Sequence, residues 1–166
     1  GTSASDVWIV GTNGKSLHYD GSKLVEVATD AETNTDTAPL LTVDASGERP
    51  YAVGGAGNGL ILEYDGADWL DRSPDFEAGY NGVCASADSG VAVGVRGGRA
   101  VRGTDGAWLS DRDAGIDSWT DRDWHGCTIT PDGGVWTVGG RIAARPLKEG
   151  AIAYWGPDEP PTATLD

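Results

Sequence analysis

Short runs of alternating apolar and polar residues recur along the chain, and each run ends in glycine. They read VWIVG at 7–11, YAVG at 51–54, VAVG at 91–94 and VWTVG at 135–139. A period of two is typical of a β-strand with one buried face, and a closing glycine lets the backbone turn or approach a neighbouring strand closely. No stretch has a convincing helical period. The pattern therefore predicts an all-β chain.

The strand runs belong to a repeat that is marked by three motifs in a fixed order. The Val-Gly pairs are 43, 40 and 45 residues apart and end at Gly11, Gly54, Gly94 and Gly139. A Ser/Thr-x-Asp motif recurs every 44 residues and ends at Asp44, Asp88 and Asp132. An Asp-Gly pair begins at Asp20, Asp65 and Asp105, and Glu149 takes that place in the last copy. A period in the low forties with several strands per unit is typical of propeller blades.

Each unit of the repeat is predicted to form four strands. In the third unit we expect these strands at 82–86, 90–94, 98–102 and 107–111. The sequence thus predicts a β-propeller of about four four-stranded blades over residues 1–156. The repeats are expected near 1–40, 41–80, 81–124 and 125–156.

The two ends of the chain raise the question of how the ring closes. The first repeat begins at its second strand, and the segment 157–166 after the last repeat is rich in proline. The run TATLD at 162–166 alternates like a strand, so we expect it to return and supply the inner strand of the first blade. That pairing would close a ring of four blades. The alternative is half of a larger propeller, which a second chain or further sequence completes.

Two of the repeated motifs have a direct structural explanation. Tyr-Asp-Gly at 19–21 and 64–66 provides the positive-φ position of a tight hairpin turn. In Ser/Thr-x-Asp-x-Gly, the carboxylate is expected to accept hydrogen bonds from nearby backbone N–H groups. These aspartates recur once per blade, whereas an active site needs a single constellation. We therefore interpret them as structural.

The charge balance restricts the partners. Asp and Glu number 26 against 12 Lys and Arg, which gives a formal net charge of −14. A phosphate-binding surface needs the opposite sign, so neither nucleic acid nor an anionic membrane surface is an expected partner. No apolar run reaches the length of a membrane-spanning helix, so membrane insertion is not expected either.

The two cysteines lie on equivalent inner strands of adjacent blades, one position out of register. Cys84 is two residues before Ser86, and Cys127 is three residues before Thr130. Successive strand residues point to opposite faces, so this offset gives the parity that a bridge between blades requires. A disulfide and two separate buried thiols are both open at this point.

The segment 110–126 is the richest in side chains that could carry chemistry. Three acidic residues at alternate or nearly alternate positions loosely resemble a calcium loop, and a solvated acidic connection is the alternative. No other cofactor is expected. These candidate metal ligands are Asp111, Asp113 and Asp117. The candidate contacts to a sugar or a protein are Arg112, Trp119, Trp124 and His125. Core packing explains Trp124 equally well.

The remaining polar positions do not suggest an enzyme. His18 takes the place in the first repeat that Glu63 has in the second, so we expect this position to face solvent. The two histidines are isolated, and no nucleophile elbow, phosphate loop or paired-cysteine motif is present. The sequence therefore predicts a protein without catalytic activity.

The opening phrase GTSASDVWIVGTNGKSLHYDG resembles the repeats of bacterial propellers related to the photosystem II stability and assembly factor. The resemblance covers residues 1 to about 140 and is weaker in the last copy, which lacks Tyr-Asp-Gly. The Ser/Thr-x-Asp-x-Gly turns also resemble the Asp-box of sialidase-like propellers, without its usual Thr-Trp tail. These resemblances imply a propeller whose relatives are commonly secreted or attached to the cell surface, and they imply no single activity.

Three functions follow as hypotheses. The first is a non-catalytic propeller outside the cytoplasm (extracellular, periplasmic or at the cell surface) that acts as a protein-interaction or assembly scaffold module. Such a module would bind a protein partner, form a homo-oligomer or belong to a larger assembly. The second is a carbohydrate-binding propeller whose loop aromatics stack on a glycan. The third is a sialidase-like glycoside hydrolase, for which the required set of arginines facing a Tyr–Glu pair is not recognisable.

Overall fold

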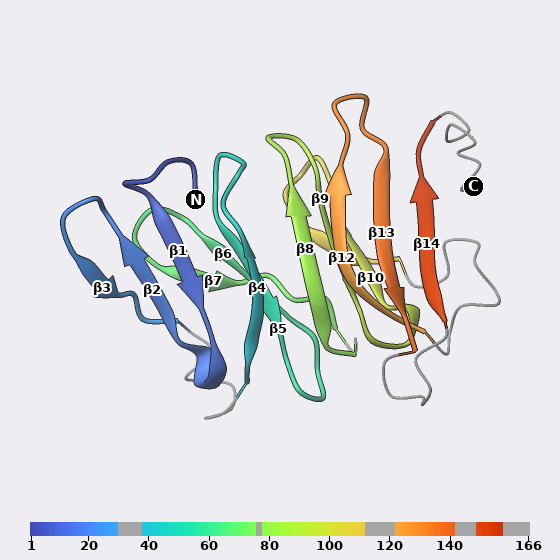
Figure 1. Cartoon of the computed structure of the whole chain (residues 1–166), viewed down its shortest axis with the longest axis horizontal. Helices are drawn as coiled ribbons and strands as arrows, with labels where there is room; N and C mark the ends of the chain where they lie inside the picture. Colours follow the sequence, from blue (N-terminus) through green and yellow to red (C-terminus); the bar gives the residue numbers. More distant parts are fainter. Residues whose placement is uncertain (30–37, 76–77, 112–121, 142–148, 158–166) are drawn as a thin grey trace.

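The computed structural model describes residues 1–29, 38–75, 78–111, 122–141 and 149–157 of the chain. The regular secondary structure of the described residues is almost entirely β-strand, as the alternating pattern predicts. They form four antiparallel sheets of three or four strands, which stand side by side in chain order (Figure 1). This is a propeller-like arrangement in which each sheet is one blade.

The strands of each sheet follow one another along the chain. The first sheet consists of β1 (Val7–Val10), β2 (Ser16–Tyr19) and β3 (Leu24–Glu26). The second consists of β4 (Leu40–Asp44), β5 (Tyr51–Gly54), β6 (Leu60–Tyr64) and β7 (Trp69–Asp71). The third consists of β8 (Tyr80–Ala85), β9 (Gly90–Gly94), β10 (Arg99–Arg102) and β11 (Trp108–Ser110). The fourth consists of β12 (Asp123–Ile129), β13 (Val135–Gly140) and β14 (Gly150–Trp155). Two single-turn 3₁₀ segments, η1 (Thr12–Gly14) and η2 (Val95–Gly97), follow β1 and β9.

The predicted strands of the third repeat are confirmed to within two residues at each end. The pairings also show that β1 takes the place of β5, β9 and β13, because each of these strands carries the Val-Gly pair or leads directly into it. Within the described residues, the first sheet therefore lacks the inner strand that β4, β8 and β12 provide in the others.

The two central sheets are buried on both faces. We call the face of a sheet toward the next sheet in chain order its forward face, and the opposite one its backward face. Between the first and second sheets lie Trp8, Ala52, Leu62 and Trp69, among others. Between the second and third lie Tyr51, Val53, Ala92 and Trp108, and between the third and fourth lie Val91, Val93, Trp124 and Val135. All of β5 is buried for this reason, whereas an exposed strand would alternate.

An aromatic side chain at the same repeat position leads the packing of the first two interfaces. Trp8 on β1 contacts Trp69 of the second sheet edge-on at 5.3 Å between ring centroids. Tyr51, at the equivalent position on β5, contacts Trp108 of the third sheet at 5.6 Å in the same manner. Such edge-to-face pairs each contribute about 0.5–1.5 kcal/mol beyond the area that they bury. The repeat thus encodes how one blade stacks on the next.

Polar contacts also join the inner strands β4, β8 and β12 to one another, close to a β-bulge that recurs in all three. Each inner strand has a bulge, at Leu41, Asn81 and His125 respectively. Thr42 Oγ1 donates to the Asn81 carbonyl (2.6 Å), and Asn81 Nδ2 donates to the Trp124 carbonyl (2.8 Å). The bulge therefore turns a polar group of one sheet toward the backbone of its neighbour.

The Val-Gly glycines allow the second strand to approach the bulged inner strand closely. A Cβ added at Gly94 would lie 2.7 Å from Cα of Tyr80, which is closer than real Cβ contacts come. The prediction that glycine is needed for close approach is therefore confirmed at this position.

The hairpin and turn aspartates have the contacts that their motifs predict. Gly21 and Gly66 have φ of +90° and +109°, which glycine adopts without strain. Asp20 Oδ1 accepts from the backbone N–H of Lys23 (3.0 Å), and these contacts lower the pKa of Asp20 to about 2. Asp44 accepts from the Ser46 N–H (2.9 Å), and its other oxygen accepts from the Ala85 N–H of the third sheet (2.8 Å).

Cys84 and Cys127 form a disulfide bond between β8 and β12, with their Cα atoms 5.7 Å apart. The bridge joins the third and fourth sheets at their inner strands. Of the two possibilities that the register left open, the structure has the bridge, because β8 and β12 lie next to each other.

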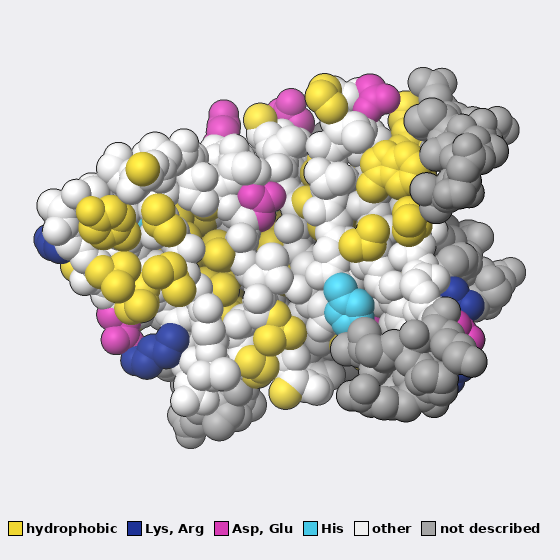
Figure 2. Space-filling model, in the orientation of Figure 1, with side chains coloured by type: hydrophobic (Ala, Val, Ile, Leu, Met, Phe, Trp, Pro, Cys, Tyr) yellow, Lys and Arg dark blue, Asp and Glu magenta, His cyan; other side chains and the backbone are white. Residues whose placement is uncertain are grey.

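The four sheets form an open row in this structure. The first and fourth sheets lie at its opposite ends (Figure 1). The segment 162–166, which we expect to supply the missing inner strand, lies outside the described residues. Hydrophobic side chains gather on the surface over β1–β3 at one end and over β12–β14 at the other (Figure 2).

Candidate functional site

The structure places the predicted ligand-contacting residues differently from expectation. Trp124 is 1% exposed and packs edge-on against Trp155 at 6.0 Å, so its ring is part of the core and is not available to a ligand. His125 lies at the bulge of β12, within a strand, and is half-buried. For Trp124 the structure therefore has the core-packing alternative. His125 lies in a strand rather than in a loop, because β12 begins at Asp123, and its contact with a ligand stays a prediction. Arg112 and Trp119 lie outside the described residues.

The predicted calcium ligand Asp111 is the counter-ion of an arginine. Its Oδ2 atom is 2.6 Å from Arg99 Nη2, and the Arg99 guanidinium stacks over the ring of Trp155 at 4.4 Å. Burial between the third and fourth sheets lowers the pKa of Arg99, and the Asp111 charge offsets part of that effect. Asp113 and Asp117 lie outside the described residues, so the calcium loop stays a prediction. Within the part of the chain that the structure describes, no three His, Cys, Asp or Glu side chains gather as a metal site would require.

A groove between the second and third sheets brings together residues that the sequence does not link. It has a volume of about 660 Å³ and is open to solvent. Its walls come from the β4–β5 turn, β6, the end of β7, β10 and the β10–β11 turn. The charged and aromatic lining residues are Glu48, Arg49, Glu63, Arg72, Arg102, Asp105 and Trp108.

A buried carboxylate organises one wall of the groove. Glu63 is 4% exposed. Its Oε1 atom accepts from Arg49 Nη1 (2.6 Å) and its Oε2 atom accepts from Arg72 Nε (3.0 Å). The hydrogen bond to Glu63 and its charge raise the pKa of Arg49. The expectation that this repeat position faces solvent is wrong for Glu63, because the third sheet covers the forward face of the second.

The opposite wall carries buried hydrogen-bond donors that have no acceptor. Arg102 and Trp108 are cross-strand partners on β10 and β11, so their side chains lie on the same face. That face is the backward face of the third sheet, which meets Tyr51 and Glu63. Arg102 Nε and Trp108 Nε1 are buried without a hydrogen-bond partner. The Arg102 guanidinium lies 5.7 Å from the centre of the Tyr51 ring.

The groove differs in charge from the rest of the chain. Three arginines line it together with three carboxylates, so its formal charge is balanced in a chain of net charge −14. Glu63 is already engaged by Arg49 and Arg72, and Asp105 accepts from the Ala107 N–H (3.0 Å). The side chains of Arg49 and Arg72 are about half exposed. Arginine N–H groups that face an open groove recognise carboxylates and carbonyl oxygens.

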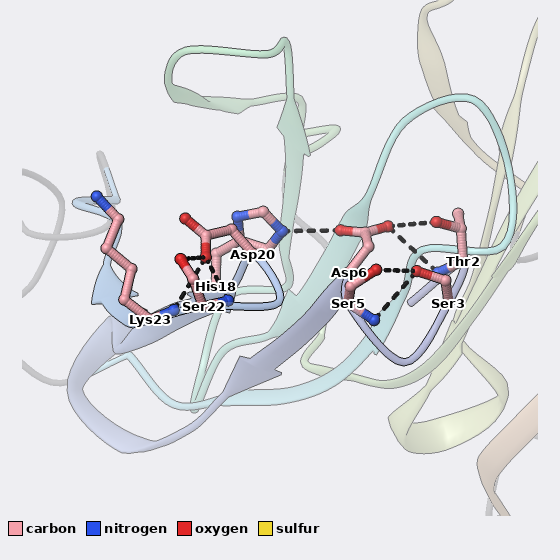
Figure 3. A network of polar contacts seen from close by, with 8 residues as sticks. All are labelled: Thr2, Ser3, Ser5, Asp6, His18, Asp20, Ser22 and Lys23. Carbon is pink, nitrogen blue, oxygen red and sulfur yellow. Dashed lines mark hydrogen bonds and ion pairs between the residues drawn. The ribbon is translucent and has the colours of Figure 1, made fainter.

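A second polar cluster lies at the first hairpin (Figure 3). His18 Nε2 lies 2.7 Å from Asp6 Oδ1, and the ring of His18 stacks on Trp8 at 4.3 Å. Because an ionised carboxylate only accepts, His18 carries its proton on Nε2 in this contact. Hydrogen bonds from Thr2 and His18 lower the pKa of Asp6 to about 2. The cluster ties the segment before β1 to β2 and so orders the first sheet.

The sequence signals for the groove were weak. Arg49, Glu63, Arg72 and Arg102 come from different repeat positions, so no spacing connects them. A possible signal is that Glu63 stands in an otherwise apolar strand, LILEY. A charged residue there needs a partner, and the arginines 14 residues before it and 9 residues after it are candidates.

The fold and the groove define this chain as a propeller-like β-protein with a polar groove between two blades. No protein-family model matches the chain, and no curated protein matches it. Among solved structures, it is similar to YCF48 bound to D1 peptide, with 16% sequence identity and a TM-score of 0.40. That alignment covers 95% of this chain and 62% of the other, so the chain spans less than two thirds of that protein's length. No helix among the described residues is long and apolar enough to cross a membrane.

Proposed function

We propose that this chain is a non-catalytic propeller-like module that binds a carboxylate-rich segment of a partner protein in the groove between its second and third sheets. The observation that carries the proposal is the set of three arginines, Arg49, Arg72 and Arg102, that line one open groove, with the side chains of Arg49 and Arg72 about half exposed. An arginine that faces an open groove offers charge-assisted N–H donors to a bound carboxylate.

The engagement of the other acidic side chains supports a binding rather than a catalytic role. Asp20 and Asp44 are bonded to turn backbone, Asp111 to Arg99 and Glu63 to two arginines. Each of these carboxylates therefore has a structural partner. A general acid or base must instead be free to exchange a proton with a substrate.

The disulfide supports a location outside the cytoplasm. Both cysteines of the chain are used in the bridge between the third and fourth sheets. Disulfides persist in oxidising compartments and are rare in the cytosol. The proposed setting is accordingly the cell surface, the periplasm or the extracellular space.

Fluorescence anisotropy with a fluorescein-labelled hexaglutamate peptide tests the proposal. We expect saturable binding that weakens as salt is added, since the contacts are charge-assisted. Arg102→Ala should weaken the binding at least tenfold. Lys23→Ala, which removes an exposed cation far from the groove, should change nothing.

Two results would count against the groove. One is that the hexaglutamate peptide shows no saturable binding and gives the same anisotropy signal as an uncharged hexaglutamine peptide. The other is equal loss of binding in the Lys23→Ala and Arg102→Ala variants, which would indicate general charge attraction. A carbohydrate-binding role keeps the predicted contacts Arg112 and Trp119, and a glycan array with Trp119→Ala beside the parent chain tests it.

A further inference from the structure

The two end sheets each present an apolar face that no element of the described chain covers. On the backward face of the first sheet, Ile9 and Leu24 are 46% and 52% exposed. On the forward face of the fourth sheet, Val138 and Ile152 are 50% and 61% exposed. Figure 2 shows hydrophobic side chains gathered over both ends of the row. In the central sheets, both faces are covered by a neighbouring sheet.

The backward face of the first sheet has the same layout as that of the second. Pairing gives Ile9 opposite Leu17 and Tyr19 opposite Leu24 in the first sheet. It gives Ala52 opposite Leu62 and Tyr64 opposite Trp69 in the second. The two sets occupy equivalent positions of the repeat, as the aligned Tyr-Asp-Gly motifs show. Ala52, Leu62 and Trp69 are the residues that receive Trp8 from the preceding sheet.

The forward face of the fourth sheet likewise repeats that of the first. Trp136 occupies the position of Trp8, three residues before the glycine of Val-Gly. Tyr154 is the cross-strand partner of Trp136, as His18 is of Trp8. The ring pairs are also alike, with centroid distances of 4.9 Å for Trp136–Tyr154 and 4.3 Å for Trp8–His18. The forward face of the fourth sheet therefore resembles the forward face of the first, and the backward face of the first sheet resembles the backward face of the second. These are the two kinds of face that pack together between the first and second sheets.

We propose that the forward face of the fourth sheet packs on the backward face of the first sheet of a second copy of this chain. In this contact Trp136, Val138 and Ile152 of one copy meet Ile9, Leu17 and Leu24 of the other. It reproduces the stacking of the first sheet on the second within one chain. The inference rests on the end sheets alone and is independent of the groove.

The symmetry of the assembly follows from the contact. The two faces differ, so each contact joins unlike faces, and a twofold axis between two copies closes a ring that contains this contact twice. Such a ring holds eight sheets, which lies within the range of four to eight blades that is usual for propellers. Closure also covers both exposed faces of each copy, whereas a contact between two like faces would leave the other face of each copy open.

Light scattering coupled to size-exclusion chromatography tests the assembly. We expect the wild-type chain to elute with the mass of two chains at tens of micromolar. Ile152→Glu and Leu24→Glu each block one of the two faces and alter exposed side chains, so the folded chain should remain and its mass should fall to that of one chain. Leu109→Glu is the matched control, since it changes an equally exposed leucine on the third sheet and adds the same charge.

Mixing the two variants separates a contact between unlike faces from a contact between two like faces. The Leu24→Glu chain keeps its forward face and the Ile152→Glu chain keeps its backward face, so an equimolar mixture should form a two-chain species. A wild-type chain that stays monomeric at 100 μM would overturn the proposal. Dissociation of the Leu109→Glu control, or no association in the mixture, would do so as well. Binding of hexaglutamate is measured separately, and its failure would leave this outcome unaffected.

Discussion

The bridge between Cys84 and Cys127 should account for a large part of the chain's stability. The cysteines are 43 residues apart in sequence and join neighbouring sheets. A cross-link that closes a loop of this length removes chain entropy from the unfolded state worth about 4 kcal/mol at 25 °C. Domains of this size typically unfold with 5–15 kcal/mol, so the bridge would supply a substantial fraction of the total. Reduction should therefore lower the melting temperature by about 8–16 °C.

Urea unfolding, followed by the fluorescence of the seven tryptophans, measures this contribution. The wild-type chain is equilibrated with and without a phosphine reductant through the transition, so that the buried bridge is reached in the unfolded state. The Cys84→Ala/Cys127→Ala variant provides the control. It lacks the bridge, so it should be less stable than the oxidised wild type and should not respond to the reductant.

Two outcomes would refute this reasoning. Labelling of two thiols in the untreated protein, under denaturing and non-reducing conditions, would show that no bridge exists. An unchanged urea midpoint after complete reduction would show that the bridge does not constrain the unfolded chain. A changed slope of the transition would instead indicate that the fourth sheet detaches separately once the bridge is broken.

Three further predictions follow from individual contacts. Glu63→Gln should lower the free energy of unfolding by about 1–3 kcal/mol in urea titrations, because it weakens two charge-assisted hydrogen bonds whose arginines are half exposed to water; an unchanged midpoint would show that the pair adds nothing to stability. Gly94→Ala should cost about 1–3 kcal/mol, since its Cβ forces β9 away from β8, while the same change at the unconfined Gly57 should cost little. Asp6 and Asp20 have folded pKa values of about 2, below the ordinary value of 3.8, so their contribution is present above pH 4 and is lost as pH falls toward 2. Melting temperatures recorded from pH 6 to pH 2 should fall in that window, and Asp20→Asn should reduce the fall.

The strands were predictable from sequence because their signals are local. A tight hairpin needs a positive φ, and Gly21 and Gly66 supply it at places that the sequence marks. The third sheet accordingly has its strands within two residues of the expected ranges. For the two cysteines, the sequence predicted only that their side chains could point toward each other from adjacent strands. Whether the sulfur atoms meet depends on the distance between two sheets, which no local signal sets.

The candidate site was harder to predict, because it depends on which side chains of one sheet meet which side chains of the next. The repeat shows that His18 and Glu63 share a position, and both are on a forward face. What that face meets differs between the two interfaces. Glu63 is covered by the third sheet and paired with Arg49 and Arg72, whereas His18 stacks on Trp8 and contacts Asp6. The repeat thus encodes the face of a residue, and the neighbouring blade decides its surroundings.

The response to salt distinguishes the two proposed surfaces. Binding in the groove depends on arginine and carboxylate charges, so it should weaken as ionic strength rises and the screening length falls below about 8 Å. The end faces have an apolar set on each side, namely Ile9, Leu17 and Leu24 against Trp136, Val138 and Ile152. Two chains of net charge −14 repel each other as they associate through these faces, and salt screens that repulsion. The fraction of two-chain species, measured by sedimentation at 50 mM and 500 mM sodium chloride, should therefore rise with salt while the affinity for hexaglutamate falls. A two-chain species that dissociates at 500 mM salt would mean that charge pairs hold the copies together, and the apolar end faces would then not be the contact.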